Sequence, residues 1–105
     1  MAAKIDKVTI AVKNMDAMAA FYTKALGAEL KKIGPTVTGR LGDVKLLLCP
    51  REIAGVTAEQ NTIQLRFVVR DLAKTMTAAL DAGGEKIDDV SVRDPDGNSI
   101  EFAEE

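Results

Sequence analysis

A single carboxylate stands in an otherwise apolar strand near the end of the sequence, and it is the first candidate for chemistry. Glu101 lies between Ile100 and Phe102. A carboxyl group held in such a strand could act alone as a general acid or base. The 105 residues include no histidine, so a serine or cysteine nucleophile would lack an imidazole base. We expect Cys49 to be a packed small side chain.

The residues just before Glu101 predict the tight turn that positions it. Pro95 fixes φ, Asp94 and Asp96 can accept hydrogen bonds from the backbone ahead of them, and Gly97 supplies a positive φ. This chemistry predicts a hairpin between strands at residues 90–93 and 99–102.

Length and composition limit the class of protein. A chain of 105 residues predicts one compact domain over residues 1–105, and 47% hydrophobic with 29% charged residues is typical of globular proteins. A net charge of −2 gives no electrostatic reason to expect nucleic acid or membrane as partner. One cysteine allows no internal disulfide, and the N-terminus shows no secretory run, so we expect a cytoplasmic protein.

The first half of the sequence predicts a strand, a helix and three further strands. Asn14 is placed to cap a helix whose apolar residues recur at helical spacing until Gly27 ends it. Alternating or short apolar runs predict the strands at residues 5–12, 28–33, 36–41 and 44–49.

The second half repeats this order after an exposed connector. A strand is expected at 63–69, a helix from Asp71 to Gly83 and Gly84, and strands around Ile87, at 90–93 and at 99–102. The constant offset that pairs Lys7 with Gln64 also aligns the later strand and helix positions of the two halves. The repeat predicts an internal duplication, with module one at about 4–50, a connector at 51–61 and module two at about 62–104.

The closing hairpin, Asp-Pro-Asp-Gly-Asn-x-Ile-Glu-Phe at residues 94–102, resembles that of the vicinal oxygen chelate superfamily. This superfamily includes glyoxalase I, bleomycin resistance proteins and extradiol dioxygenases. The opening run 7–12 and the segment 21–27 are similar to its usual beginning. The resemblance implies an α+β fold of two βαβββ modules that form a curled mixed sheet around a cup, with the helices outside.

The resemblance also implies where a metal would be bound, and this sequence departs from the pattern there. The two histidine positions match Lys7 and Gln64, the final-strand glutamate matches Glu101, and the fourth position falls near Leu46 or, after a one-residue slip, Lys45. Neither lysine nor leucine suits a divalent ion at neutral pH. We therefore expect no metal cofactor, unless a dimer partner or a chelating substrate supplies donors.

The remaining polar residues of the cup predict a binding site for a small molecule. Lys7 and Glu101 are expected to form an ion pair where relatives hold metal; the alternative is that both are hydrated. Strand alternation places Arg66 on the same face as Gln64, and a guanidinium group favours an oxyanion. The predicted ligand-binding residues are therefore Lys7, Gln64, Arg66 and Glu101, with a small anionic ligand.

We expect a metal-free small-molecule binding protein of the glyoxalase and bleomycin resistance type, present as a homodimer because so small a core leaves sheet edges to cover. One alternative is a metal-dependent lyase, isomerase or dioxygenase that uses Glu101. Another is a structural or regulatory dimeric module with a closed cup. The sequence leaves open whether Arg40 and Arg93 point into the cup.

Overall fold

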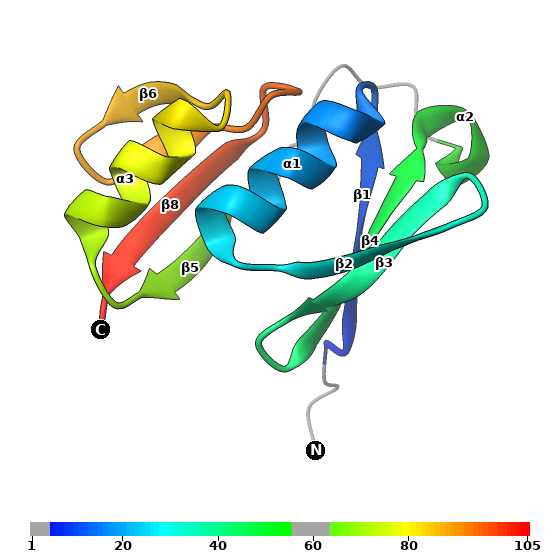
Figure 1. Ribbon diagram of the computed structural model, residues 1–105, viewed down its shortest axis with the longest axis horizontal. Coiled ribbons are helices and arrows are strands. Elements are labelled where there is room, and N and C mark those ends of the chain that lie inside the picture. The colour runs from blue at the N-terminus through cyan, green and yellow to red at the C-terminus, as the bar shows by residue number, and fades with distance from the viewer. Residues whose placement is uncertain (1–4, 56–63) are drawn as a thin grey trace.

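Two βαβββ modules make up the computed structural model, which describes residues 5–55 and 64–105 (Figure 1). Module one contains β1 (Lys7–Val12), α1 (Met15–Leu26), β2 (Glu29–Ile33), β3 (Thr36–Leu41) and β4 (Val44–Pro50), and a short helix α2 (Arg51–Ala54) follows it. Module two contains β5 (Leu65–Val69), α3 (Leu72–Asp81), β6 (Glu85–Asp88), β7 (Ser91–Arg93) and β8 (Ser99–Glu104). The predicted α+β class and the predicted duplication of the βαβββ unit are confirmed.

Each module forms its own four-stranded mixed sheet with the same strand order. The order is β1-β4-β3-β2 in module one and β5-β8-β7-β6 in module two. In both sheets the first and last strands of the module run parallel, and the other pairs are antiparallel. Within the described ranges no strand pair joins the two sheets, so β1 and β5 are both edge strands.

Side-chain caps start both long helices, as their sequences predict. Asn14 Oδ1 accepts a hydrogen bond from the Ala17 backbone N–H at 3.2 Å, and Asp71 Oδ1 accepts one from the Lys74 N–H at 3.0 Å. Each cap satisfies a backbone donor that the first helical turn leaves unpaired. Gly27, with φ of 71°, ends α1 in the left-handed conformation.

Strand alternation gives each sheet a buried helix face and an opposite face. Ile10 and Val12 of β1 pack with the helix residues Met18 and Phe21 in the hydrophobic core. The intervening residues of every strand therefore lie on the face turned away from the helix, which we call the open face. Lys7 and Lys45 of module one, and Arg66 and Glu101 of module two, lie on the open faces.

The junction between the modules is made by helices and by the closing hairpin. Helices α1 and α3 lie side by side (Figure 1), and a Cβ added at Gly84 of module two would lie 2.9 Å from Phe21 Cε2. The Asp96 carboxylate accepts hydrogen bonds from the Lys13 and Asn14 N–H groups at 2.7 and 3.3 Å. The turn before β8 thus holds the N-terminus of α1 and fixes one module against the other.

The predicted exposed connector begins with a short helix. Residues Arg51–Ala54 form α2, which follows Pro50 and ends at Gly55 with φ of 72°. Pro50 cannot donate to the sheet and a left-handed glycine stops a helix, so a single turn fits between them. Residues 56–61 of the predicted connector, and Ile63 of the predicted strand, lie outside the described residues. No helix in the described ranges is long and apolar enough to span a membrane.

Candidate functional site

Glu101 forms its ion pair with Arg66, the residue beside it on the neighbouring strand. The Arg66 Nε to Glu101 Oε1 distance is 3.3 Å, and the two residues are register partners of β5 and β8. Lys7 lies on the edge strand of the other sheet, so the predicted Lys7–Glu101 pair is wrong. Adjacent strands bring the guanidinium within reach of Glu101. The side chains are 68% and 39% exposed, so the pair contributes little stability.

Other polar groups on the open face of module two also pair with each other. Gln64 Nε2 donates to Ser99 Oγ at 2.6 Å, and Arg93 Nη1 lies 3.4 Å from Glu85 Oε1. Arg93 pairs in register with both Ser99 and Glu85. The structure therefore brings Gln64, Arg66 and Glu101 onto one face, where their polar groups are largely satisfied.

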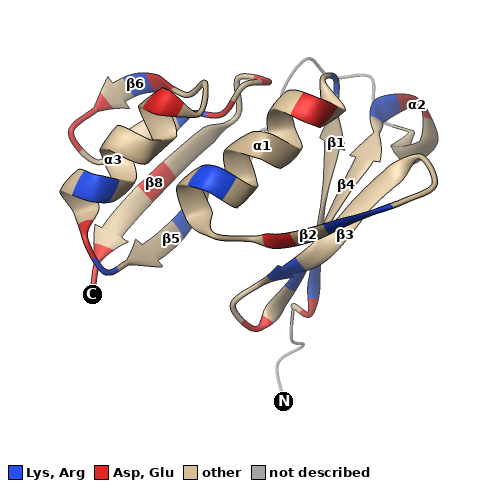
Figure 2. Cartoon of the chain, in the orientation of Figure 1, with Lys and Arg blue, Asp and Glu red and all other residues tan. Residues whose placement is uncertain are grey.

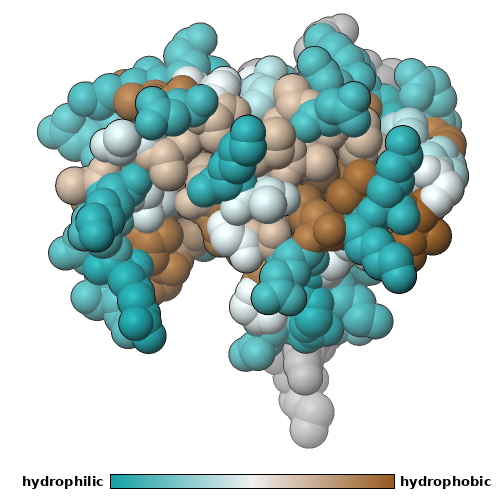
Figure 3. Space-filling view, in the orientation of Figure 1, coloured by the Kyte–Doolittle hydropathy of each residue, from teal (hydrophilic) through white to brown (hydrophobic). Residues whose placement is uncertain are grey.

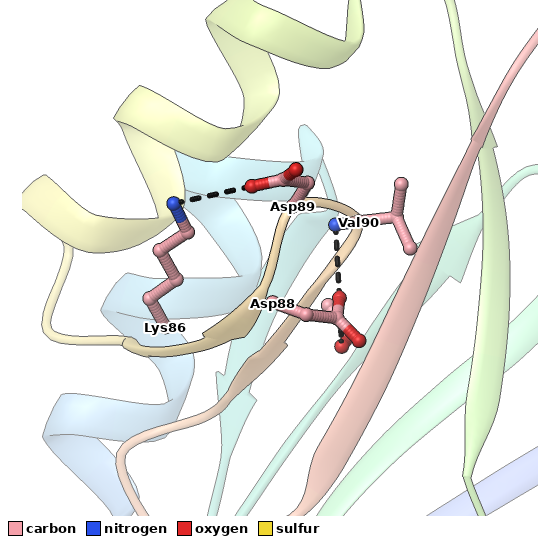
Figure 4. Close-up of polar contacts among 5 residues, drawn as sticks. Lys86, Asp88, Asp89 and Val90 are labelled. Atoms are coloured by element: carbon pink, nitrogen blue, oxygen red, sulfur yellow. Dashed lines mark hydrogen bonds and ion pairs between the residues drawn. The ribbon is translucent and has the colours of Figure 1, made fainter.

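The turn from β6 to β7 has polar contacts of its own, beside helix α3 (Figure 4). Asp88 Oδ1 accepts hydrogen bonds from Ser91 Oγ at 2.6 Å and from the Val90 N–H at 3.0 Å. The Ser91 hydroxyl, followed by the Val90 N–H, holds the pKa of Asp88 below its usual range. Lys86 Nζ lies 3.5 Å from Asp89 Oδ1 across the same turn. These contacts hold the turn in place, and the Asp88 carboxylate is already engaged by two hydrogen-bond donors.

The metal-ligand positions that the resemblance implies do not fit a divalent ion in this structure. Leu47 pairs with Thr9 as Glu101 pairs with Arg66, so Leu47, and not Leu46 or Lys45, occupies the place equivalent to Glu101. Leucine has no donor atom, and Glu101 already binds a guanidinium. In residues 5–55 and 64–105 no three His, Cys, Asp or Glu side chains lie together as a metal site would require.

A cavity of about 510 Å³ lies between the modules, beside the edges of the two sheets. Figure 3 shows hydrophobic surface bordering the hollow between the two lobes, below α1. We call this space the inter-module cavity. Its lining comes from β1, the end of α1, the β3–β4 hairpin and β5: Val8, Leu26, Leu41, Gly42, Val44, Lys45, Leu46, Leu65, Arg66, Phe67, Val68 and Val69. This volume and this mostly apolar lining are typical of small-molecule sites.

Two cations, one from each module, are part of this lining. Arg66 is a predicted ligand-binding residue, whereas the sequence indicates Lys45 only as an alternative metal-ligand position. Lys7, Gln64 and Glu101 lie outside the lining. Blue segments gather on neighbouring strands at the lower end of the first sheet (Figure 2). Strand alternation places the Lys45 side chain on the open face beside Lys7, so the sequence gives no signal that Lys45 contributes to the cavity lining.

A buried polar centre, which the sequence did not indicate as a site, lies at the module junction. Asp94 is 3% exposed, and its Oδ2 accepts hydrogen bonds from the Tyr22 hydroxyl at 2.9 Å and from Asn98 Nδ2 at 3.0 Å. Its Oδ1 accepts from the Asp96 and Asn98 N–H groups at 3.0 and 2.9 Å, as the turn chemistry predicts. Burial raises the pKa of Asp94 and, more strongly, that of Tyr22. Asp94 accepts hydrogen bonds from four donors at the junction between the modules, and it does not line the cavity.

Comparison with known proteins agrees with this architecture. The family described as a glyoxalase-like domain matches residues 7–103. No curated protein sequence matches the chain.

Solved structures share the fold at low sequence identity. A glyoxalase-related enzyme from Fulvimarina pelagi is 20% identical with a TM-score of 0.82, over 97% of this chain and 88% of that one. A glyoxalase/bleomycin resistance protein/dioxygenase family enzyme from Burkholderia phytofirmans PsJN is 18% identical with a TM-score of 0.81, over 97% and 98%. An integron cassette protein from V. cholerae is 23% identical with a TM-score of 0.75, over 99% and 96%. At these identities the likeness concerns the fold alone.

Proposed function

The chain belongs to the glyoxalase-like domain family of the vicinal oxygen chelate superfamily, and on this premise we propose that it binds a small anionic molecule without a metal. The binding site is the inter-module cavity. Its occupant contacts apolar side chains of both modules, while Lys45 and Arg66 attract its negative charge.

The observation that carries this proposal is the joint lining of one cavity by both modules. Leu41, Val44 and Leu46 supply apolar surface from module one, and Leu65 and Phe67 supply it from module two. Both cations are exposed to solvent, so their attraction for an anion should weaken as salt concentration rises. None of the lining residues within 5–55 and 64–105 is acidic, so the lining favours an anion over a cation.

A thermal-shift screen of small carboxylic acids and phosphates, with and without a chelator, tests this proposal. A ligand at 100 times its Kd should stabilise the native state by about 2.7 kcal/mol and raise the melting temperature, whether or not the chelator is present. Arg66→Gln should weaken the effect, whereas Arg70→Gln, which removes the same charge just beyond β5, should not. Equal losses in both variants would contradict a role for Arg66.

The same screen separates the two rival functions. An enzyme that uses a metal through Glu101 would bind a divalent ion in stoichiometric amount and lose it on Glu101→Gln. A structural or regulatory module would gain no stability from any acid in the panel. Metal analysis of the purified protein and of Glu101→Gln therefore completes the test.

We also propose that the protein is a homodimer. Both β1 and β5 are sheet edges in the described part of the chain, and Val68 of β5 is 66% exposed. Unpaired edge strands and exposed apolar side chains are stabilised when a second copy covers them. Light scattering should give twice the 11.2 kDa of one chain; a monomer at all concentrations would contradict the proposal.

A further inference from the structure

The apolar wall that module one gives to the inter-module cavity and the Lys45 ammonium group lie on opposite faces of the first sheet. Val44 and Leu46 flank Lys45 on β4, and successive side chains of a strand point to opposite faces. Because Val44 and Leu46 belong to the apolar lining, the ammonium group of Lys45 is directed away from it. Lys45 therefore attracts an anion from a distance, and direct contact with an anion in the cavity falls to Arg66.

The charge of Arg66 is already compensated inside module two. Its Nε lies 3.3 Å from Glu101 Oε1, and Glu101 is outside the cavity lining. On the other side of Glu101, the register partner Ser91 donates its hydroxyl to Asp88. Within the described residues, Arg66 is therefore the side chain that balances the Glu101 charge. A ligand that reaches Arg66 meets a guanidinium group and a carboxylate together.

The contact with Glu101 leaves most of the Arg66 guanidinium group available to a ligand. A guanidinium group has five N–H donors, and the contact with Glu101 is made through Nε. The N–H groups on Nη1 and Nη2 can donate to both oxygens of one carboxylate. The Arg66 side chain is 68% exposed, so a charged group bound there stays hydrated, while an apolar chain attached to it is removed from water in the cavity.

The charge balance of Arg66 and Glu101 discriminates between possible charged groups. The two side chains together carry no net charge, so each negative charge on a ligand is attracted by Arg66 and repelled by Glu101. A carboxylate is ionised once at pH 7, whereas a phosphate monoester carries a charge of about −1.5 to −2. At equal distance, Glu101 therefore repels the phosphate up to about twice as strongly as the carboxylate. The pair favours a singly charged ligand.

We propose that the ligand is an apolar monocarboxylic acid, with its carboxylate at Arg66 and its chain in the inter-module cavity, and that Glu101 determines this specificity by repelling doubly charged anions. This inference rests on the proposed anion-binding function and assigns its ligand class. The glutamate at the place of a metal ligand thus selects the charge of the ligand in this chain.

Calorimetric titration with octanoate, octyl phosphate and octanol, below micelle-forming concentrations, tests the assignment. The three probes have the same apolar chain and differ in the charge of the head group. Octanoate should bind about twofold to fivefold more tightly than octyl phosphate, which is the size expected for one exposed charge–charge interaction. It should also bind severalfold more tightly than octanol, because only the carboxylate is held by Arg66.

Matched variants test the role of Glu101. Glu101→Gln should strengthen octyl phosphate more than octanoate, so that the preference for the carboxylate is lost. Glu85→Gln breaks a comparable exposed pair with Arg93 outside the cavity lining, so the preference should remain. Arg66→Gln should remove the advantage of octanoate over octanol. Because both ion pairs are exposed, all three variants should keep nearly the melting temperature of the natural protein, which shows that they fold.

The outcomes separate this inference from the proposed function. If octyl phosphate binds as tightly as octanoate, or if Glu101→Gln and Glu85→Gln behave alike, the assignment of a monocarboxylic acid selected by Glu101 is wrong and anion binding in the cavity stands. If neither acid binds more tightly than octanol, both the assignment and the proposed function are overturned.

Discussion

Equivalent strand positions form a row across the open face of each module, but the side chains in the two rows carry different charges. In module one the row contains Lys7, Lys45, Arg40 and Glu29, and in module two the equivalent row contains Gln64, Ser99, Arg93 and Glu85. Both rows end in an arginine beside a glutamate. Module two fills the first two places with neutral groups that hydrogen bond to each other, whereas module one places two lysines there. The backbone repeat is therefore preserved while the positive charge of the row is concentrated in module one.

Truncation of a buried core side chain in either module is expected to have the largest effect on the free energy of unfolding. Leu48 of module one is fully buried and Phe102 of module two is 2% exposed. Leu48→Ala should lower the free energy of unfolding by about 2–5 kcal/mol and Phe102→Ala by about 3–5 kcal/mol. Because α1 packs on α3 and the Asp94–Asp96 turn binds α1, both substitutions should shift one shared transition, measured by denaturant unfolding with circular dichroism.

The volume-conserving change Leu48→Met is the control for the core comparison, with an expected cost below about 1.5 kcal/mol. Two separate transitions, each moved by only one of the alanine substitutions, would show that the modules unfold independently.

The junction between the modules gives the next largest effect. Asp94→Asn removes an acceptor from a buried centre of four donors, so it should destabilise the protein by about 1–3 kcal/mol. Burial raises the pKa of Asp94, so the folded protein keeps this proton to a higher pH than the unfolded chain does. The contribution of Asp94 to stability is therefore greatest below its ordinary pKa and declines as pH rises through the raised value.

Unfolding free energies of the natural protein and of Asp94→Asn, measured from about pH 4 to pH 7, check this sign. The difference in the free energy of unfolding between the two proteins should become smaller as pH increases. Asp81→Asn, at an exposed position at the end of α3, should show no such trend. A difference that widens with pH would contradict the raised pKa of Asp94.

The arginines of the two rows give the smallest effect and the most direct contrast. Arg93→Gln breaks a solvent-exposed pair with Glu85, so it should lower stability by no more than about 0.5 kcal/mol. Arg40→Gln should instead raise stability by a few tenths of a kcal/mol, because it relieves repulsion from Lys45. Urea unfolding at low and high salt measures both changes in the free energy of unfolding. The two changes should have opposite signs at low salt and should approach each other at high salt. Equal signs would show that the rows do not differ in charge balance.

The repeat seen in the sequence also conceals a difference that only the structure shows. The constant offset pairs Gly27 with Gly84, but the left-handed glycine that follows α3 is Gly83, with φ of 101°. Gly84 has a different role, because a Cβ there would come within 2.8 Å of the Ala79 carbonyl oxygen and 2.9 Å of Phe21. Its conformation is ordinary, but the end of α3 in its own module and Phe21 of module one together leave no room for a side chain.

The sequence by itself determined the order of elements within each module, the helix caps at Asn14 and Asp71, and the turn chemistry of Asp94 and Gly97. Each of these depends on contacts between residues close together in the chain, so local residue types suffice to predict them.

Only the tertiary structure decided that Glu101 pairs with Arg66, that Leu47 takes the equivalent place in module one, and that Lys45 lines a cavity shared with β5. These facts depend on strand register and on how the modules pack. A shift of one residue in register moves a side chain to the opposite face of its sheet, and local residue types do not specify that choice.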